Sequence, residues 1–136
     1  MCGVAKDVTV NDFMSGLIAT CATRGISTLS LRGDAFFEAM KAAYEALRAI
    51  APSEGLELRF RIILDEIYGD SPTVREAIST AVQRNLISLD NPEYQDMRVK
   101  FGRYEADKIL AGLPGRPEVY AAVTDAYLEH ERVSVA

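Results

Sequence analysis

Apolar residues recur at the spacing of an α-helix in two stretches of the amino-terminal half. The first stretch spans about Val10 to Thr23, with Thr9 or Asn11 placed to cap it and Gly25 placed to end it. The second runs from a capping Asp34 to about Ile50, with an alanine-rich remainder that favours a helix. The apolar stripes consist of Phe13, Leu17, Ile18 and Cys21 in the first helix and Phe37, Met40, Tyr44 and Leu47 in the second.

Two further segments have a different or mixed period. Residues 26–31 alternate apolar and polar side chains, which predicts a short strand. After the linker 51–55, the segment from Leu56 to Tyr68 fits both a strand and a helix. We favour a helix from about Leu58, because Gly69 can form a turn and residues 70–73 offer caps for a new helix.

The next helix is predicted from Thr73 to Arg84. Thr73 and Glu76 fit a capping box, and Pro72 suits the start of a helix but not its interior. We expect this helix to bury an apolar side and to expose a mostly hydrogen-bonding one. The side expected to be buried consists of Val74, Ala77, Ile78, Ala81 and Val82.

From Leu86 the period falls to two, and the turn signal Asn91-Pro92 separates two alternating runs. This pattern predicts a β-hairpin directly after a helix. Residues 102–111 and Pro117 to about Glu131 then read as two closing helices. The sequence therefore predicts a mainly α fold with a small β-hairpin.

Composition narrows the class of protein. At 136 residues the chain is long enough for one domain but not for two separate cores. No run approaches the roughly 20 apolar residues of a membrane span, and the first residues lack the layout of a secretory signal, so we expect a cytoplasmic protein. Cys2 and Cys21 form neither a disulfide framework nor a metal site, and we expect no metal and no cofactor.

The residues from 64 to 87 resemble part of the winged helix-turn-helix of GntR-type regulators. The matching residues are Leu64, Gly69, Ser71, the run Thr73-Val74-Arg75-Glu76-Ala77-Ile78, and Leu86-Ile87. The sequence departs from that motif by one fewer residue before Thr73, by Pro72, and by Asn85 where a glycine is expected. The order of elements is closer to MarR-like regulators, whose terminal helices build the dimer.

These resemblances imply a single winged-helix-like domain over residues 1–136, with flanking amino- and carboxyl-terminal helices. The helix-turn-helix is expected at about 58–85, the wing at about 86–101 and the closing helices at about 102–131. They imply a homodimeric transcriptional regulator that binds double-stranded DNA.

The expected DNA contacts follow from what each side chain offers. Arg75 and Gln83 match base edges, guanine and adenine respectively, while Ser71 and Thr73 lie where a helix amino terminus can hold a phosphate. Arg98 and Lys100, alternate residues in the wing, can reach an adjacent phosphate or the minor groove. The full predicted set is Ser71, Thr73, Arg75, Ser79, Gln83, Arg84, Arg98 and Lys100.

Charge favours a second interpretation. The net charge is -5, and between residues 71 and 108 each basic residue is matched by an acidic one. Non-specific binding to nucleic acid is driven by many cations that displace counterions, so this balance argues against a protein that coats DNA. The alternative is an acidic protein-protein interaction module, such as an adaptor or an inhibitor of a DNA-binding partner.

Catalysis has little support in the sequence. His130 is the only histidine and lies near the carboxyl end, where a surface position is expected. Asp65 and Glu66 are neighbours and point to different sides of a helix. No nucleophile elbow, phosphate loop or dinucleotide fingerprint occurs. We therefore expect a protein that is not an enzyme.

Overall fold

The computed structural model describes residues 6–30, 35–64, 71–89 and 96–135, with side chains described as far as His130. The elements of this part are, in chain order, β1 (Lys6–Val8), α1 (Val10–Thr23), β2 (Thr28–Ser30), α2 (Ala35–Ile50), the 3-10 helix η1 (Ala51–Glu54), β3 (Leu56–Leu58), α3 (Pro72–Gln83), β4 (Ile87–Ser88), β5 (Asp96–Val99), α4 (Arg103–Gly112) and α5 (Pro117–Val135). The predominantly helical prediction is confirmed in these residues.

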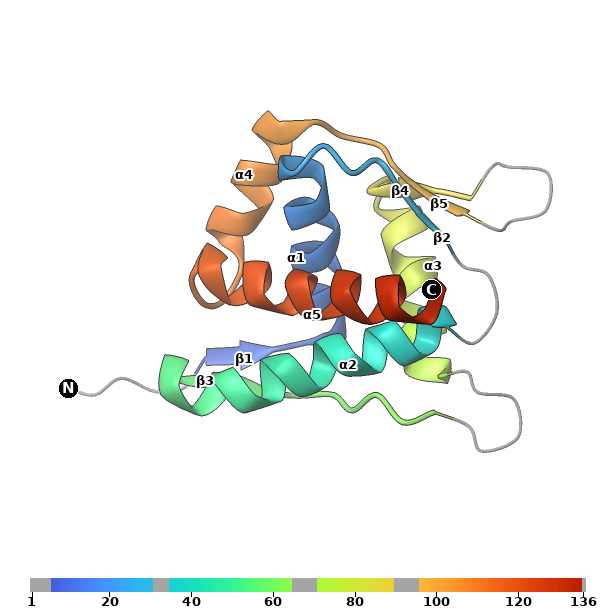
Figure 1. Cartoon of the computed structure of the whole chain (residues 1–136). Coiled ribbons are helices and arrows are strands. Elements are labelled where there is room, and N and C mark those ends of the chain that lie inside the picture. Colours follow the sequence, from blue (N-terminus) through green and yellow to red (C-terminus); the bar gives the residue numbers. More distant parts are fainter. Residues whose placement is uncertain (1–5, 31–34, 65–70, 90–95, 136) are drawn as a thin grey trace.

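Helix α1 lies at the centre of the molecule. It packs against α3, α4 and α5 (Figure 1), and residues 13–21 are all buried. The predicted start is confirmed: Thr9 accepts a hydrogen bond from the Asp12 N–H, and the Asp12 carboxylate accepts one from the Thr9 N–H, which is a capping box. Gly25, with φ at 76°, turns the chain out of α1 toward β2.

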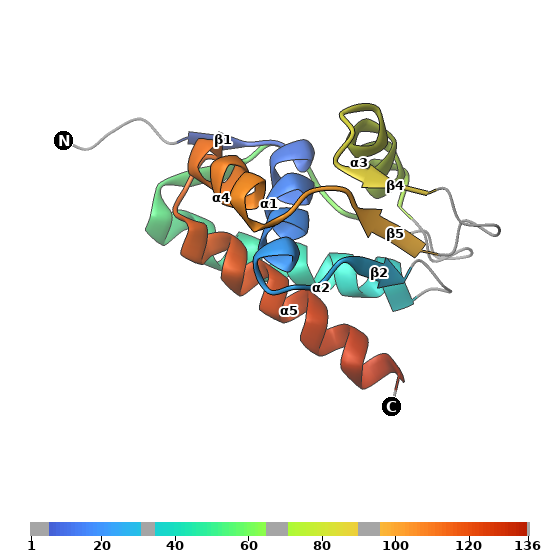
Figure 2. The ribbon, with the colours of Figure 1, turned by 90° about the horizontal axis from the view of Figure 1, so that it is seen from above.

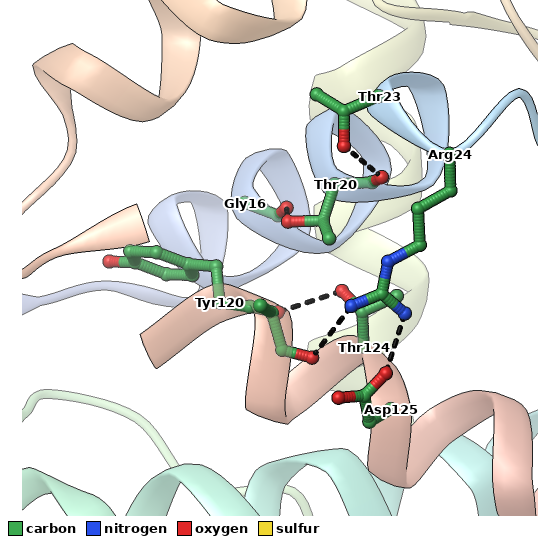
Figure 3. A network of polar contacts seen from close by, with 8 residues as sticks. Gly16, Thr20, Thr23, Arg24, Tyr120, Thr124 and Asp125 are labelled. Atoms are coloured by element: carbon green, nitrogen blue, oxygen red, sulfur yellow. Dashed lines mark hydrogen bonds and ion pairs between the residues drawn. The ribbon is translucent and has the colours of Figure 1, made fainter. Parts of the chain in front are cut away.

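Helix α5 crosses α1 at close range and also packs along α2. Figure 3 shows the polar contacts at the α1–α5 crossing. Arg24, at the end of α1, contacts Asp125 of α5 with 2.6 Å between its nitrogen and the carboxylate oxygen. The hydroxyls of Thr20 and Thr124 donate to the carbonyls of Gly16 and Tyr120 in their own helices, so these two buried side chains are satisfied where the helices meet.

A three-stranded antiparallel sheet has the order β2-β5-β4. In Figure 2, viewed from above, it lies at the same end of the molecule as α3 and away from α4. The strand predicted at 26–31 is confirmed as β2, and the hairpin predicted after Leu86 is confirmed as β4 and β5. The sequence did not predict that β2 joins the hairpin, with Leu29 opposite Met97. Both of these side chains are buried.

The helix predicted from about Leu58 is wrong. Leu56–Leu58 form β3, which pairs in parallel with β1, and residues 59–64 form no helix. The alternation of Leu56, Leu58 and Phe60 was the correct signal, but its partner β1 is only three residues long and was not predicted. The predicted cap Asp34 and the turn at Gly69 lie outside the described residues.

The connection from α2 to α3 is therefore long. It contains η1, β3 and the extended segment after it, whereas a helix-turn-helix joins its two helices by three or four residues. Helix α3 packs mainly on α1. The described residues thus lack the first helix of the helix-turn-helix that was expected at 58–85.

Among the helices that the structure describes, none is both long and apolar enough to cross a membrane.

Candidate nucleic-acid interface

The N-cap of helix α3 lies two residues before Thr73, from which the capping box was predicted. Ser71 is the N-cap: its backbone is extended, and its hydroxyl accepts from the Val74 N–H at 3.3 Å. Pro72 at the first helical position explains this choice, because proline disfavours the helical conformation in the residue before it. The capping box predicted from Thr73 is therefore wrong, and Thr73 lies in the first turn.

Capping also decides what Ser71 can offer a ligand. The residue is 1% exposed, so its hydroxyl serves the helix and does not reach solvent. The prediction that the Ser71 side chain contacts a phosphate is therefore wrong, because its hydroxyl is buried and accepts from the Val74 N–H. Thr73 is half-buried, so part of this residue remains at the surface.

The two sides of α3 are separated largely as predicted. Val74, Ala77 and Ala81 are buried, at 0%, 1% and 4% exposure. Val82 is an exception at 37%, because the buried stripe follows 74, 77 and 81 and leaves residue 82 at its edge. The exposed residues are Pro72, Arg75, Glu76, Ser79, Val82, Gln83 and the C-cap Arg84.

Arg75 has a partner within the molecule. Its guanidinium carbon lies 5.4 Å from the centre of the Phe37 ring of α2, within the range of a cation-π contact. Since the residue is exposed, the contact orients the guanidinium without burying it. Glu76 follows on the same exposed side, so this side carries both signs of charge.

The end of α3 turns sharply toward the sheet. The Leu86 N–H donates to the Ala81 carbonyl at 2.9 Å, and the Asn85 N–H donates to the Val82 carbonyl at 3.0 Å, which is a Schellman motif. Asn85 has φ at 64°, a left-handed conformation that Asn adopts more readily than most residues. Asn85, which departs from the GntR-type motif in residue type, thus adopts the backbone conformation that a glycine there would supply.

The sheet places the predicted wing cations on its outer side. Arg98 lies on the central strand β5, is exposed, and stands opposite Thr28 of β2 and Ser88 of β4. Its neighbour Met97 is fully buried, as the alternation of a strand requires. Thr28 was not predicted as part of this surface, because the pairing of β2 with β5 cannot be seen in the local sequence.

Lys100 connects the sheet to the end of α3. Its ammonium nitrogen donates to the Asn85 side-chain oxygen at 2.6 Å, and its N–H donates to the Leu86 carbonyl at 3.0 Å. A cation near a helix carboxyl terminus also interacts favourably with the helix dipole. The structure therefore brings Lys100 together with the carboxyl-terminal end of α3, where Gln83 and Arg84 lie, and not with Thr73 at its start.

Within the described part of the chain, Arg84 and Arg98 form no ion pair. Their charges are exposed and available to an anion. The same part of the chain contains no group of three or more His, Cys, Asp or Glu arranged to hold a metal.

Comparison of the chain with protein-family models, with curated proteins and with solved structures gave no match.

Proposed function

We propose that α3 and the adjoining three-stranded sheet form a surface that binds double-stranded DNA, in a protein that acts as a transcriptional regulator or a similar factor. The observation that supports this most directly is the continuity of the surface. An exposed, hydrogen-bonding helix side ends in a tight turn onto a sheet whose central strand presents Arg98 between Thr28 and Ser88.

In the proposed complex the exposed side of α3 enters the major groove. Arg75, Ser79 and Gln83 offer donors and acceptors of the kinds that base edges match. Arg84, Arg98 and Lys100 bind flanking phosphates, which set the register of the protein on the duplex. The order of elements, a strand before α2 that pairs with the hairpin after α3, supports a winged architecture, although the long α2–α3 connection differs from a helix-turn-helix.

A mobility-shift titration with a random-sequence duplex tests the proposal. We expect a shift at 50 mM salt that weakens strongly by 200 mM, because the binding depends on release of counterions from phosphates. Absence of a shift at both salt concentrations, with folded protein, would refute it.

One observation favours the alternative of an acidic protein-protein interaction module. Glu76 stands on the exposed side of α3 beside Arg75, and Arg75 already contacts Phe37. A carboxylate at this position repels phosphates, while a protein partner can pair with it. The same titration separates the two candidates, since the interaction module gives no shift at either salt concentration.

The homodimer through the terminal helices stays a prediction. Sedimentation equilibrium, which measures mass in solution, tests it independently of DNA binding.

A further inference from the structure

A groove separates α2 from the chain that includes β3 and the residues after it. Its volume is about 580 Å³. One wall carries Lys41, Tyr44 and Arg48 of α2, and the other is the extended chain from Leu56 to Ile63, which runs along α2 in Figure 1. The rings of Tyr44 and Phe60, with centroids 5.4 Å apart, make an apolar contact between the two walls.

Among the strands that the structure describes, β3 has a partner on one edge only, which is β1. The Lys6 N–H donates to the Gly55 carbonyl, and the Arg59 N–H donates to the Val8 carbonyl, both at 2.9 Å. In this parallel register Gly55, Glu57 and Arg59 bond toward β1, so the N–H and C=O groups of Leu56 and Leu58 point to the opposite edge. There they form no hydrogen bond with any described residue.

The open edge continues beyond β3. From Phe60 to Ile63 the backbone has no regular structure and makes no hydrogen bond with the described residues. Ile63 is 66% exposed at the end of this segment. An edge of this kind is a template for another extended chain, which supplies the missing main-chain partners.

The charge of the groove is opposite to that of the molecule. Lys41, Arg48 and Arg61 line it, are exposed, and form no ion pair in the described structure. The two acidic lining residues are Glu45 and Glu57, and Glu57 shares its partner Arg59 with Asp7, so three cations face two carboxylates in the groove. The groove is therefore locally cationic on a chain with a net charge of -5.

We infer that this groove binds an extended, acidic segment of a partner protein, which adds as a strand to the open edge of β3. Leu56 and Leu58 supply the main-chain hydrogen bonds. Lys41, Arg48 and Arg61 select carboxylates, which an extended segment presents on one side at alternate residues, about 7 Å apart. This inference does not depend on DNA binding, because α3 and the outer side of the sheet do not line the groove.

Selection from a random octapeptide library displayed on phage tests the inference with the intact protein as bait. We expect enriched peptides with Asp or Glu at alternate positions. Their affinity, measured by fluorescence polarisation with synthetic peptides, should fall at least about tenfold for the double variant Lys41→Glu, Arg61→Glu, because attraction becomes repulsion. The matched control is Arg103→Glu, Lys108→Glu, which makes the same change of charge on α4.

A second measurement separates strand addition from general charge attraction and leaves the protein unchanged. Methylation of single backbone nitrogens along a selected peptide should abolish binding at alternate positions only, since only alternate N–H groups of a strand face the neighbouring strand. The inference is overturned if no peptide is enriched, if binding survives the groove reversal, or if every methylated peptide still binds.

Discussion

Gly16 of α1 lies against the ring of Tyr120 of α5, where the two helices cross (Figure 3). A β-carbon on residue 16 would be 2.2 Å from Tyr120 Cδ1, far inside van der Waals contact. Tyr120 is fully buried, and its hydroxyl donates to the Pro114 carbonyl at 2.5 Å, so the ring has little room to move away from Gly16. The crossing of the two helices thus depends on the absence of a side chain at one position.

Gly16→Ala should destabilise the protein by about 1–3 kcal/mol through overpacking, even though alanine is the better helix former. Chemical denaturation followed by circular dichroism measures the change. Gly112→Ala in α4 is the matched control, because a β-carbon there meets nothing within 4 Å. We expect the control to be neutral or stabilised, and equal stability of the two variants would contradict the packing argument.

Alkaline pH should destabilise the fold through Tyr120. Burial raises the pKa of Tyr120 in the folded protein, and the nearby charge of Asp12 raises it further. Its contribution to stability is complete below the pKa of an unfolded tyrosine, about 10, and is lost as pH rises above that value, because only the unfolded chain then releases the proton.

The measurement is unfolding free energy at pH 8 and pH 11 for the wild type and Tyr120→Phe. We expect the wild type to lose more stability than the variant, which has no proton to release at this position. Parallel losses would show that Tyr120 is not responsible.

Asn85 should tolerate glycine better than alanine. At φ of 64°, alanine pays the steric cost of the left-handed region, about 1 kcal/mol, and glycine does not. Both substitutions remove the hydrogen bond from Lys100, so the difference in stability between the two variants reports the cost of the left-handed backbone conformation alone. Thermal melts of the two variants test this, and a more stable alanine variant would be the contrary result.

The proposed DNA binding should weaken when exposed cations of the surface are removed. Arg75→Ala with Arg98→Ala should lower affinity and reduce the salt slope by up to about 0.9 for each lost phosphate contact. Arg75 also contacts Phe37, so replacing it removes a contact within the protein. The double variant Arg84→Ala, Arg98→Ala repeats the test and leaves this contact in place.

Lys108→Ala is the matched control for these variants. Lys108 lies on α4, which is at the opposite end of the molecule from α3 (Figure 1), and its ammonium group contacts the Tyr104 ring. We expect its binding isotherm to equal that of the wild type. A loss as large as that of the surface variants would point to overall charge and away from a defined surface.

Local sequence predicted the elements whose signals are local. The apolar periods of α1 and α2 and the alternation of the hairpin were sufficient, since each reports one buried side of one element. The helix predicted within 56–64 was wrong because the conformation of this segment depends on its pairing with β1, some fifty residues away in the chain. A three-residue strand such as β1 carries almost no periodic signal. The same limit hid the pairing of β2 with β5.

The candidate site was predictable in composition but not in arrangement. Exposure of Arg75, Ser79, Gln83, Arg84 and Arg98 follows from helical and strand periods. Other features depend on contacts that the local sequence does not show. The Ser71 hydroxyl is buried because Ser71, not Thr73, caps α3. The contacts of Arg75 with Phe37 and of Lys100 with Asn85 depend on tertiary packing. The groove beside β3 was not predicted, because it exists only where a helix was expected.

The pairing of β2 with β5 joins distant parts of the chain, which affects when the sheet forms during synthesis and folding. Thr28 of β2 pairs with Arg98 of β5, so the three-stranded sheet can form only after most of the chain has left the ribosome. Pairings between such distant residues slow folding. A fragment that starts after β2 would lack one edge of its sheet, and the hairpin cannot be transplanted as an independent module.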